Sequence, residues 1–572
     1  MNRAAGREIA AKTGCQRTFA YVNFRFSTYP MGVGDINKDF REFVDAHVAL
    51  VEPLNRECAL AYWRASLTGS ESDFKRYADL QMKLEQIYAN RDDFDRIKQV
   101  CESKSAGEGN LGRIADLLYL RYLGNQVDPG LLGRIVDLSA SVENRFSIFR
   151  PAAGGCELTT NEVYRILRTE ADSAKRREVW EASKRVGRLV AEDLLELVSL
   201  RNESARQIGY GNFYTMSLEL SEQSEDYLVN LFAELDELTR EPFLEMKEEI
   251  DRSLAEGFHI SRGDLQPWHY HDPYFQEVPQ IDGVYLDRFF KGRDVVEIAG
   301  IFYKTIGMSV DDILERSDLY EKDGKNPHAY CTDIDRKGDI RILANVQHNS
   351  YWMETMLHEL GHGVYDKYID SGLPYILRSY PHLCTTEACA MFFGRMGQNP
   401  VWLKAALGLE EREVQDIVPH MSEFMRKKQL IFARWCQVMF NFERELYRNP
   451  QRDLNSLWWD IVERYQFVRR PDGRSEPDWA TKIHIVSNPV YYHNYMLGEL
   501  IASQFRHHIM NRILCAGRFD ECVYGRPEVG EYFRNSVFRP GNTMPWYDHI
   551  EKTTGEALSA RHFAAQFVKE PR

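Results

Sequence analysis

The sequence Leu357-His358-Glu359-Leu360-Gly361-His362-Gly363 contains the pattern His-Glu-x-x-His. On a helix, His358 and His362 are one turn apart on the same face, so both imidazoles can bind one zinc ion. Glu359, between them, is placed to reach a water on that metal. A helix is predicted because apolar residues recur here at three- and four-residue spacing, namely Trp352, Met353, Met356, Leu357 and Leu360. The alternative is a surface helix with two unrelated histidines, because zinc needs a third protein ligand from elsewhere in the chain.

A candidate for that third ligand follows in the next predicted helix. The stretch Thr385-Thr386-Glu387-Ala388 starts an apolar helix that continues through Phe393, and Glu387 is 25 positions after His362. A carboxylate one helix further on is the expected ligand when the fourth position on zinc is kept open for water. The alternative for a glutamate at a helix start is capping, where its charge stabilises the helix dipole.

The composition is that of a large folded protein with excess negative charge. The chain has 572 residues and a mass of 66.7 kDa, and 44% of its residues are hydrophobic, which is enough for a sizeable core. The formal charge of −14 argues against a nucleic-acid groove or an anionic membrane surface as the main partner. No run approaches the length of about 18 apolar residues that suggests a membrane span. The ten cysteines have neither zinc-ribbon nor redox spacing, which predicts reduced thiols in a cytoplasmic protein.

Long helices are predicted for most of the chain. One of them starts at the capping box Thr159-Thr160-Asn161-Glu162. A segment rich in proline and aromatic residues, between Gly257 and Gly283, interrupts the helices and either lines a pocket or packs beneath a lobe. Residues 1–30 are rich in arginine and poor in acids, without the apolar region of a secretory signal, and we expect a disordered arm or a mis-started segment ahead of Met31.

Residues 328–346 predict a β-hairpin just before the metal helix. A polar turn at 336–339 separates two alternating runs, the second of which is Ile340, Ile342, Ala344 and Val346. The free edge of such a hairpin can pair with an extended peptide, giving affinity through main-chain hydrogen bonds. An ordinary structural hairpin is the alternative.

A concentration of hydrogen-bond donors lies near the C-terminal end. It consists of Lys482-Ile483-His484 followed by Pro489-Val490-Tyr491-Tyr492-His493-Asn494-Tyr495. These side chains can serve a polar site, or they can form the buried aromatic start of a helix whose hydroxyls are satisfied locally.

Four separated motifs resemble those of the zinc peptidases of the angiotensin-converting enzyme family and, more distantly, of the thimet and oligopeptidase F families. They occur along the chain in the same order as in the family. They are the strand region from His328-Ala329 to Ile342, the helix His358-Glu359-Leu360-Gly361-His362, the stretch from Leu373-Pro374 to Glu387-Ala388, and Lys482-Ile483-His484-Ile485 with the tyrosine cluster. His328 precedes His358 by 30 positions, which is the family's spacing. The resemblance implies a mainly α fold of the gluzincin type, with two interleaved helical lobes around a deep central channel and a small β-hairpin beside the metal helix. Residues 31–572 would form this single catalytic domain.

The sequence departs from the family's pattern at two places. The family has an aspartate, four residues after the glutamate ligand, that orients a zinc histidine; here that position is Met391, so another group must take this part or none does. The stretch after His484 is one residue longer than in the converting enzymes and fits the oligopeptidase F spacing. Tyr492 and Tyr495 are therefore the preferred functional pair, with Tyr491 as the alternative.

The resemblance implies a metallopeptidase with one zinc ion per chain, held by His358, His362 and Glu387. Glu359 would act as general base toward the zinc-activated water, and Tyr495 with His484 would donate to the oxyanion that develops on the scissile carbonyl.

The substrates implied are short unstructured peptides, aligned by His328 and Ala329. Lys482 with Tyr492 would bind the terminal carboxylate, which makes the enzyme a peptidyl-dipeptidase that releases dipeptides from the C-terminus. Without that clamp, the site would be an oligoendopeptidase of the oligopeptidase F type. A catalytically inactive relative that binds peptides is the alternative from a different functional class.

Overall fold

The structure is a computed structural model that describes residues 33–279, 286–515 and 522–568. It is mainly α-helical and contains two small antiparallel hairpins within those ranges, which confirms the predicted fold class. The arm predicted over residues 1–30 lies outside the described residues. The division of residues 31–572 into two lobes around a channel stays a prediction.

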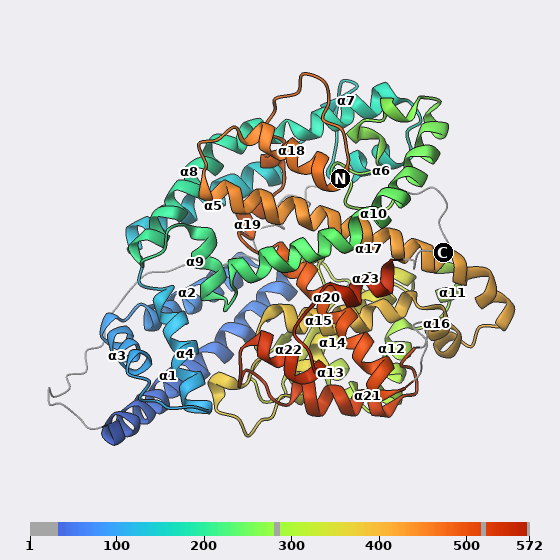
Figure 1. Ribbon diagram of the computed structural model, residues 1–572. Coiled ribbons are helices and arrows are strands. Elements are labelled where there is room, and N and C mark those ends of the chain that lie inside the picture. Colours follow the sequence, from blue (N-terminus) through green and yellow to red (C-terminus); the bar gives the residue numbers. More distant parts are fainter. Residues whose placement is uncertain (1–32, 280–285, 516–521, 569–572) are drawn as a thin grey trace.

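The first third of the chain consists of helices joined by short turns (Figure 1). They are α1 (Val33–Thr68), α2 (Glu71–Tyr88), α3 (Arg91–Glu102), α4 (Asn110–Leu123), α5 (Pro129–Ile148), α6 (Thr160–Thr169), α7 (Ser173–Lys184) and α8 (Val186–Gln207). The predicted capping box is confirmed, because Thr159 and Glu162 bond to each other's backbone at the start of α6. Gly154 and Gly155, just before α6, form the turn of a hairpin whose strands are β1 (Ala152–Ala153) and β2 (Cys156–Glu157). This hairpin was not predicted from the sequence.

The middle of the chain changes from a long helix to irregular structure. The elements are α9 (Phe213–Leu220), α10 (Glu225–Phe258), the short 3₁₀ turns η2 (Arg262–Asp264) and η3 (Pro267–His269), α11 (Asp287–Phe290), α12 (Val295–Thr305) and α13 (Asp311–Arg316). The three prolines between Gly257 and Gly283 explain why no long helix forms there, since each lacks an amide donor and fixes its own backbone.

The predicted hairpin is confirmed as β3 (Tyr330–Asp333) paired antiparallel with β4 (Ile340–Leu343). The alternation in the second strand is confirmed as well, because Ile340, Ile342 and Ala344 are fully buried. β3 packs against α14 (Ser350–Tyr368): Sγ of Cys331 lies 3.6 Å from where a Cβ at Gly363 would be. The hairpin therefore lies beside the His-Glu-x-x-His helix.

The remaining elements are again helical. They are η4 (Tyr375–Leu377), α15 (Leu383–Gly394), η5 (Arg395–Gln398), α16 (Pro400–Leu407), α17 (Glu411–Arg448), α18 (Leu454–Gln466), η6 (Asp478–Thr481), α19 (His484–Ser487), α20 (His493–His508), the π-helical η7 (Ile509–Ile513), α21 (Pro527–Tyr532), the π-helical η8 (Phe533–Phe538), α22 (Trp546–Thr554) and α23 (Arg561–Phe567). Among the described residues, none of the helices combines the length and the apolar character needed to cross a membrane.

The metal helix α14, the following helix α15 and the later helix α20 lie together inside the main hydrophobic core (Figure 1). That core runs from residues of α5 to residues of α23, and burial of its apolar side chains is the main favourable contribution to folding. A smaller core joins α1, α3 and α4. Side chains on these three central helices are therefore held by packing on several sides, as a precise site requires.

Candidate active site

The two histidines of α14 and the glutamate of α15 converge. Nε2 of His358 lies 3.8 Å from Oε2 of Glu387, and Nε2 of His362 lies 4.0 Å from Oε1 of the same carboxylate. The two imidazole rings are 4.9 Å apart between centroids and nearly perpendicular, at 82°. One ligand atom from each of the three side chains lies within 4.8 Å of the other two.

The convergence depends on small residues between the helices. A Cβ at Gly361 would lie 2.8 Å from Cα of Ala390, so α14 and α15 approach too closely for any side chain there. On the other face of α15, a Cβ at Gly498 of α20 would lie 2.9 Å from Sδ of Met391 and 3.4 Å from Cβ of Glu387. Gly361 therefore lets α14 and α15 approach closely enough for their side chains to share one ion, and Gly498 lets α20 pack closely beside Glu387 and Met391.

These three side chains fit a zinc ion. Bonds of about 2.0 to 2.2 Å place the ligand atoms of a tetrahedral site about 3.3 Å apart. Small side-chain rotations would shorten the 3.8 and 4.0 Å distances between the histidine nitrogens and the Glu387 oxygens to that value. Burial, and after it the neighbouring His358, lowers the pKa of His362 well below its usual range. The imidazole is therefore neutral at pH 7, which is the form that binds a metal.

Thr386 orients His362. Its Oγ1 lies 2.7 Å from Nδ1 of His362, so the ring is fixed by this hydrogen bond and Nε2 faces Glu387. Ligand histidines commonly use their second nitrogen in this way. Thr386 lies on the same helix as Met391, the position where the family has its aspartate, and no sequence pattern singled out its contact with His362.

We expect Thr386→Val to weaken zinc binding by about 10- to 100-fold, the usual effect of removing an outer-shell partner of a ligand. The measurement is competition with a chelator of known affinity. Thr385→Val is the matched control, because Thr385 is the adjacent residue and its Oγ1 donates to the backbone of His382 instead. Equal zinc affinity in the two variants would contradict this assignment.

Glu359 is buried on α14, between the two histidines, with 8% of its surface exposed. Its carboxylate is near Cys331 of β3, whose pKa is raised by burial first and by acidic neighbours that include Glu359. The Glu359 carboxylate therefore extends from the metal-ligand helix toward the hairpin.

Tyrosines from the start of α20 extend the site. The Tyr495 ring lies 5.2 Å from that of Tyr491 and 5.3 Å from that of Tyr492, between centroids. Burial and then the Glu387 carboxylate raise the pKa of Tyr495 to about 12, so its hydroxyl is protonated and can donate at pH 7. The same two causes raise the pKa of Tyr491, which places that residue near the metal ligands too. Tyr491 thus stays the alternative to Tyr495.

His484, at the start of α19, contacts this tyrosine group. Its ring lies 5.1 Å from that of Tyr492 between centroids, and its Nδ1 is buried with no hydrogen-bond partner among the residues that the structure describes. Burial, followed by the charge of Lys482, lowers the pKa of His484 to about 4. The side chain is therefore a neutral imidazole at pH 7 and can donate one N–H.

Lys482 lies next to Tyr492 in a buried aromatic setting. Its Nζ is 5.5 Å from the ring centroid of Tyr492 and donates a 2.8 Å hydrogen bond to Oε1 of Gln276. The Tyr492 hydroxyl accepts a hydrogen bond from Nε1 of Trp435, at 2.6 Å, and so keeps its own proton for another acceptor. The structure thus brings Lys482 and Tyr492 together as expected, and it adds Gln276, which the sequence analysis missed.

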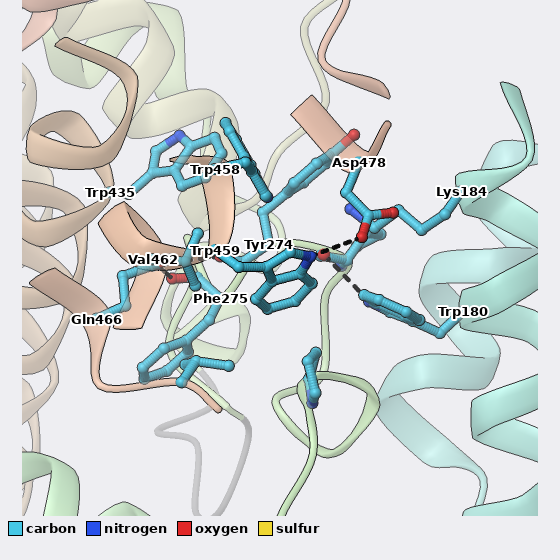
Figure 2. A pocket seen from close by; sticks show the side chains of 13 residues that line it. Trp180, Lys184, Tyr274, Phe275, Trp435, Trp458, Trp459, Val462, Gln466 and Asp478 are labelled. Carbon is cyan, nitrogen blue, oxygen red and sulfur yellow. Dashed lines mark hydrogen bonds between the residues drawn. The ribbon is translucent and has the colours of Figure 1, made fainter. Parts of the chain in front are cut away.

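An aromatic cavity, shown in Figure 2, includes Tyr274 and Trp435, the two other aromatic neighbours of Lys482. Tyr274 lines this cavity, and two buried lysines lie near its ring, with Nζ of Lys184 3.6 Å and Nζ of Lys482 5.0 Å from the ring centroid. Five other aromatic residues line the cavity, Trp180, Phe275, Trp435, Trp458 and Trp459. Both interpretations of the proline-rich segment are therefore partly right: Trp268 and Tyr270 pack inside the core, whereas Tyr274 lines a cavity.

His328 and Ala329 come just before β3. The His328 side chain is exposed, and its backbone amide donates to Oδ1 of Asn326. β3 pairs with β4 along one edge, and within the described ranges no further strand pairs with its other edge. The alignment of a peptide along β3 stays a prediction.

The fold and the His-Glu-x-x-His centre define the class of helical metallopeptidases. In comparison with known families, residues 166–569 match the model of peptidase family M3. The chain therefore belongs to peptidase family M3.

The individual relatives share low sequence identity with this chain. The chain is 23% identical to an angiotensin-converting enzyme of Theromyzon tessulatum over 47% of this chain and 45% of that protein. It is 22% identical to an angiotensin-converting enzyme of Rattus norvegicus over 64% of this chain and 30% of that protein. An inactive angiotensin-converting enzyme-related protein of Caenorhabditis elegans is 19% identical over 70% of this chain and 48% of that protein. The chain spans less than half the length of each of these curated relatives.

Proposed function

We propose that this chain is a zinc-dependent peptidase that hydrolyses short peptides, and that it releases dipeptides from their C-terminus. The observation that carries the peptidase proposal is the convergence of His358, His362 and Glu387 around one point, with Glu359 between the two histidines. The presence of all three candidate ligands and of the candidate base favours an active enzyme over an inactive peptide-binding relative.

The three ligands would hold one zinc ion, which when bound supplies a Lewis acid and lowers the pKa of water to about 7. Glu359 accepts a proton from the attacking water and passes it to the leaving amine. Tyr495 and His484 donate hydrogen bonds to the oxyanion, a role worth about 2.7 to 4 kcal/mol per donor where it has been measured. The edge of β3 beside Ala329 and His328 aligns the peptide backbone.

The group around Lys482 supports the cleavage mode that we propose. The Lys482 ammonium, hydrogen-bonded to the Gln276 amide and lying beside the Tyr492 ring, supplies a positive charge that suits a peptide's terminal carboxylate. An oligoendopeptidase is the second candidate, favoured by the family M3 match and by tyrosine spacing like that of oligopeptidase F.

A cytoplasmic location stays a prediction. It is supported by the cysteines: the described ones include Cys384, Cys389 and Cys436, and all of them are free thiols, as expected in a reducing compartment.

Metal removal tests the peptidase proposal directly. We expect about one zinc per chain after dialysis, loss of activity with a chelator and recovery on adding zinc. His358→Ala and His362→Ala should each lose both the zinc and the activity. His348→Ala is the control, since His348 is exposed and precedes α14. Full peptidase activity in the metal-free protein would refute the proposal.

A further inference from the structure

A second group of metal-binding side chains lies at the other end of α20. His507, Glu556 and His562 each offer a ligand atom within 4.8 Å of the other two. His507 is 12 positions after Tyr495 on the same helix, which is about 18 Å at a rise of 1.5 Å per residue. This group is therefore separate from the active site.

The two imidazoles are close enough to bind the same metal ion. The rings of His507 and His562 lie 4.2 Å apart between centroids at 38°. Nε2 of His562 is buried, lies 3.0 Å from Oε1 of Glu556, and has no aligned hydrogen-bond partner within the described part of the chain. This short approach already brings two of the three candidate ligand atoms together, so both can bind one ion after small side-chain rotations.

The charge state of the group suits a cation. His507 and His562 each offer one ring nitrogen, and a neutral imidazole is the form that binds a metal. Glu556 supplies one negative charge. The cationic Arg561 lies 3.8 Å from the other carboxylate oxygen, Oε2, and its side chain is 67% exposed, so it can turn toward solvent.

The backbone around the group is unusual. α20 passes at His508 into the π-helical turn η7, and such turns are rare and occur frequently at functional sites. Asn511 in that turn holds its amide 3.2 Å from Nδ1 of His507 and donates to the His507 carbonyl at 2.9 Å. Asn511, whose amide also lies 3.3 Å from Nε2 of His507, thus contacts both the ring and the backbone of this residue.

We propose that His507, Glu556 and His562 form a second metal site that takes a first-row divalent ion with a preference for imidazole, Zn²⁺ above all. Two imidazoles and one carboxylate are a common zinc ligand set, and water can complete it. Because the ligands come from α20, from the α22–α23 connection and from α23, the bound ion fastens the C-terminal helix to the helix that carries Tyr495.

The test is zinc titration of the full-length chain by calorimetry, after dialysis that leaves the tightly held ion in place. We expect the wild-type protein to bind one further zinc ion per chain, and its melting temperature to rise as zinc is added. His358→Ala, which damages only the active-site cluster, should keep this second binding event. The second site is therefore read out separately from peptidase activity.

Variants of the cluster decide the result. His507→Ala and His562→Gln should raise the dissociation constant of the second zinc at least about tenfold, since even loss of an outer-shell partner has that effect. His420→Ala, on an exposed histidine of α17, should leave it unchanged. His507 is only half-buried, so its variant tests the site even if the buried His562 variant fails to fold. Unchanged second-zinc binding in His507→Ala, or no second binding event in the wild type, would overturn the proposal.

Discussion

Replacing Glu359 with glutamine is expected to lower kcat by about 100- to 10,000-fold, the range supplied by a positioned general base, while the zinc content stays unchanged. Glutamine has nearly the same shape as glutamate, so α14 should still pack against α15 and β3. It cannot accept a proton from water at pH 7. Since Glu359 is not one of the three ligand residues, the metal should stay bound.

The measurement combines steady-state hydrolysis of a short peptide with metal analysis of the same sample. Glu354→Gln is the matched control, because Glu354 is five residues earlier on α14 and pairs with Lys428 and Gln398. That variant should keep most of the activity. A Glu359→Gln protein that contained zinc and hydrolysed peptides at the wild-type rate would remove Glu359 from the mechanism.

Local sequence patterns predicted the parts of the site that lie on single helices. His358, Glu359 and His362 follow from one motif, and the apolar spacing around them correctly predicted α14. Glu387 could be predicted as a candidate ligand because it lies on the next helix, and in the structure its carboxylate lies close to both histidines. Such patterns predict local structure well because helix geometry itself determines which residues share a face.

Long-range contacts could not be predicted in the same way. Gln276 meets Lys482 across 206 positions, from a proline-rich segment without periodicity. Thr386 belongs to a predicted helix start, but its hydrogen bond to His362 depends on how closely α14 and α15 approach each other, and hence on Gly361. The β1–β2 hairpin has only two residues per strand, too few for alternation to register. Tertiary packing decides each of these, and single-sequence patterns do not contain it.

The second large effect is expected at the group formed by Lys482, Gln276 and Tyr492. If this group binds the terminal carboxylate, a hexapeptide with a free C-terminus should lose dipeptides stepwise, and the same peptide with a C-terminal amide should be cut at least about 100-fold more slowly. The reason is that the ammonium of Lys482 is buried, and leaving a buried charge without its partner costs about 3 to 5 kcal/mol. Mass spectrometry of the two digests over time gives both the products and the rates.

Lys482→Met should remove this discrimination by lowering kcat/KM for the free-acid peptide about 100-fold or more, with little change for the amidated peptide. Burial lowers the pKa of Lys482 to about 8, so the wild-type side chain is still mostly charged at pH 7, and a bound carboxylate would stabilise that charge. Lys184→Met is the matched control, because Lys184 is also buried and lies over the same Tyr274 ring, but its other aromatic neighbour is Trp180, whereas those of Lys482 are Trp435 and Tyr492. It should keep the preference for a free carboxylate. Internal cleavage that is indifferent to amidation, in both the wild type and Lys482→Met, would instead establish the oligoendopeptidase mode and leave the metal centre untouched.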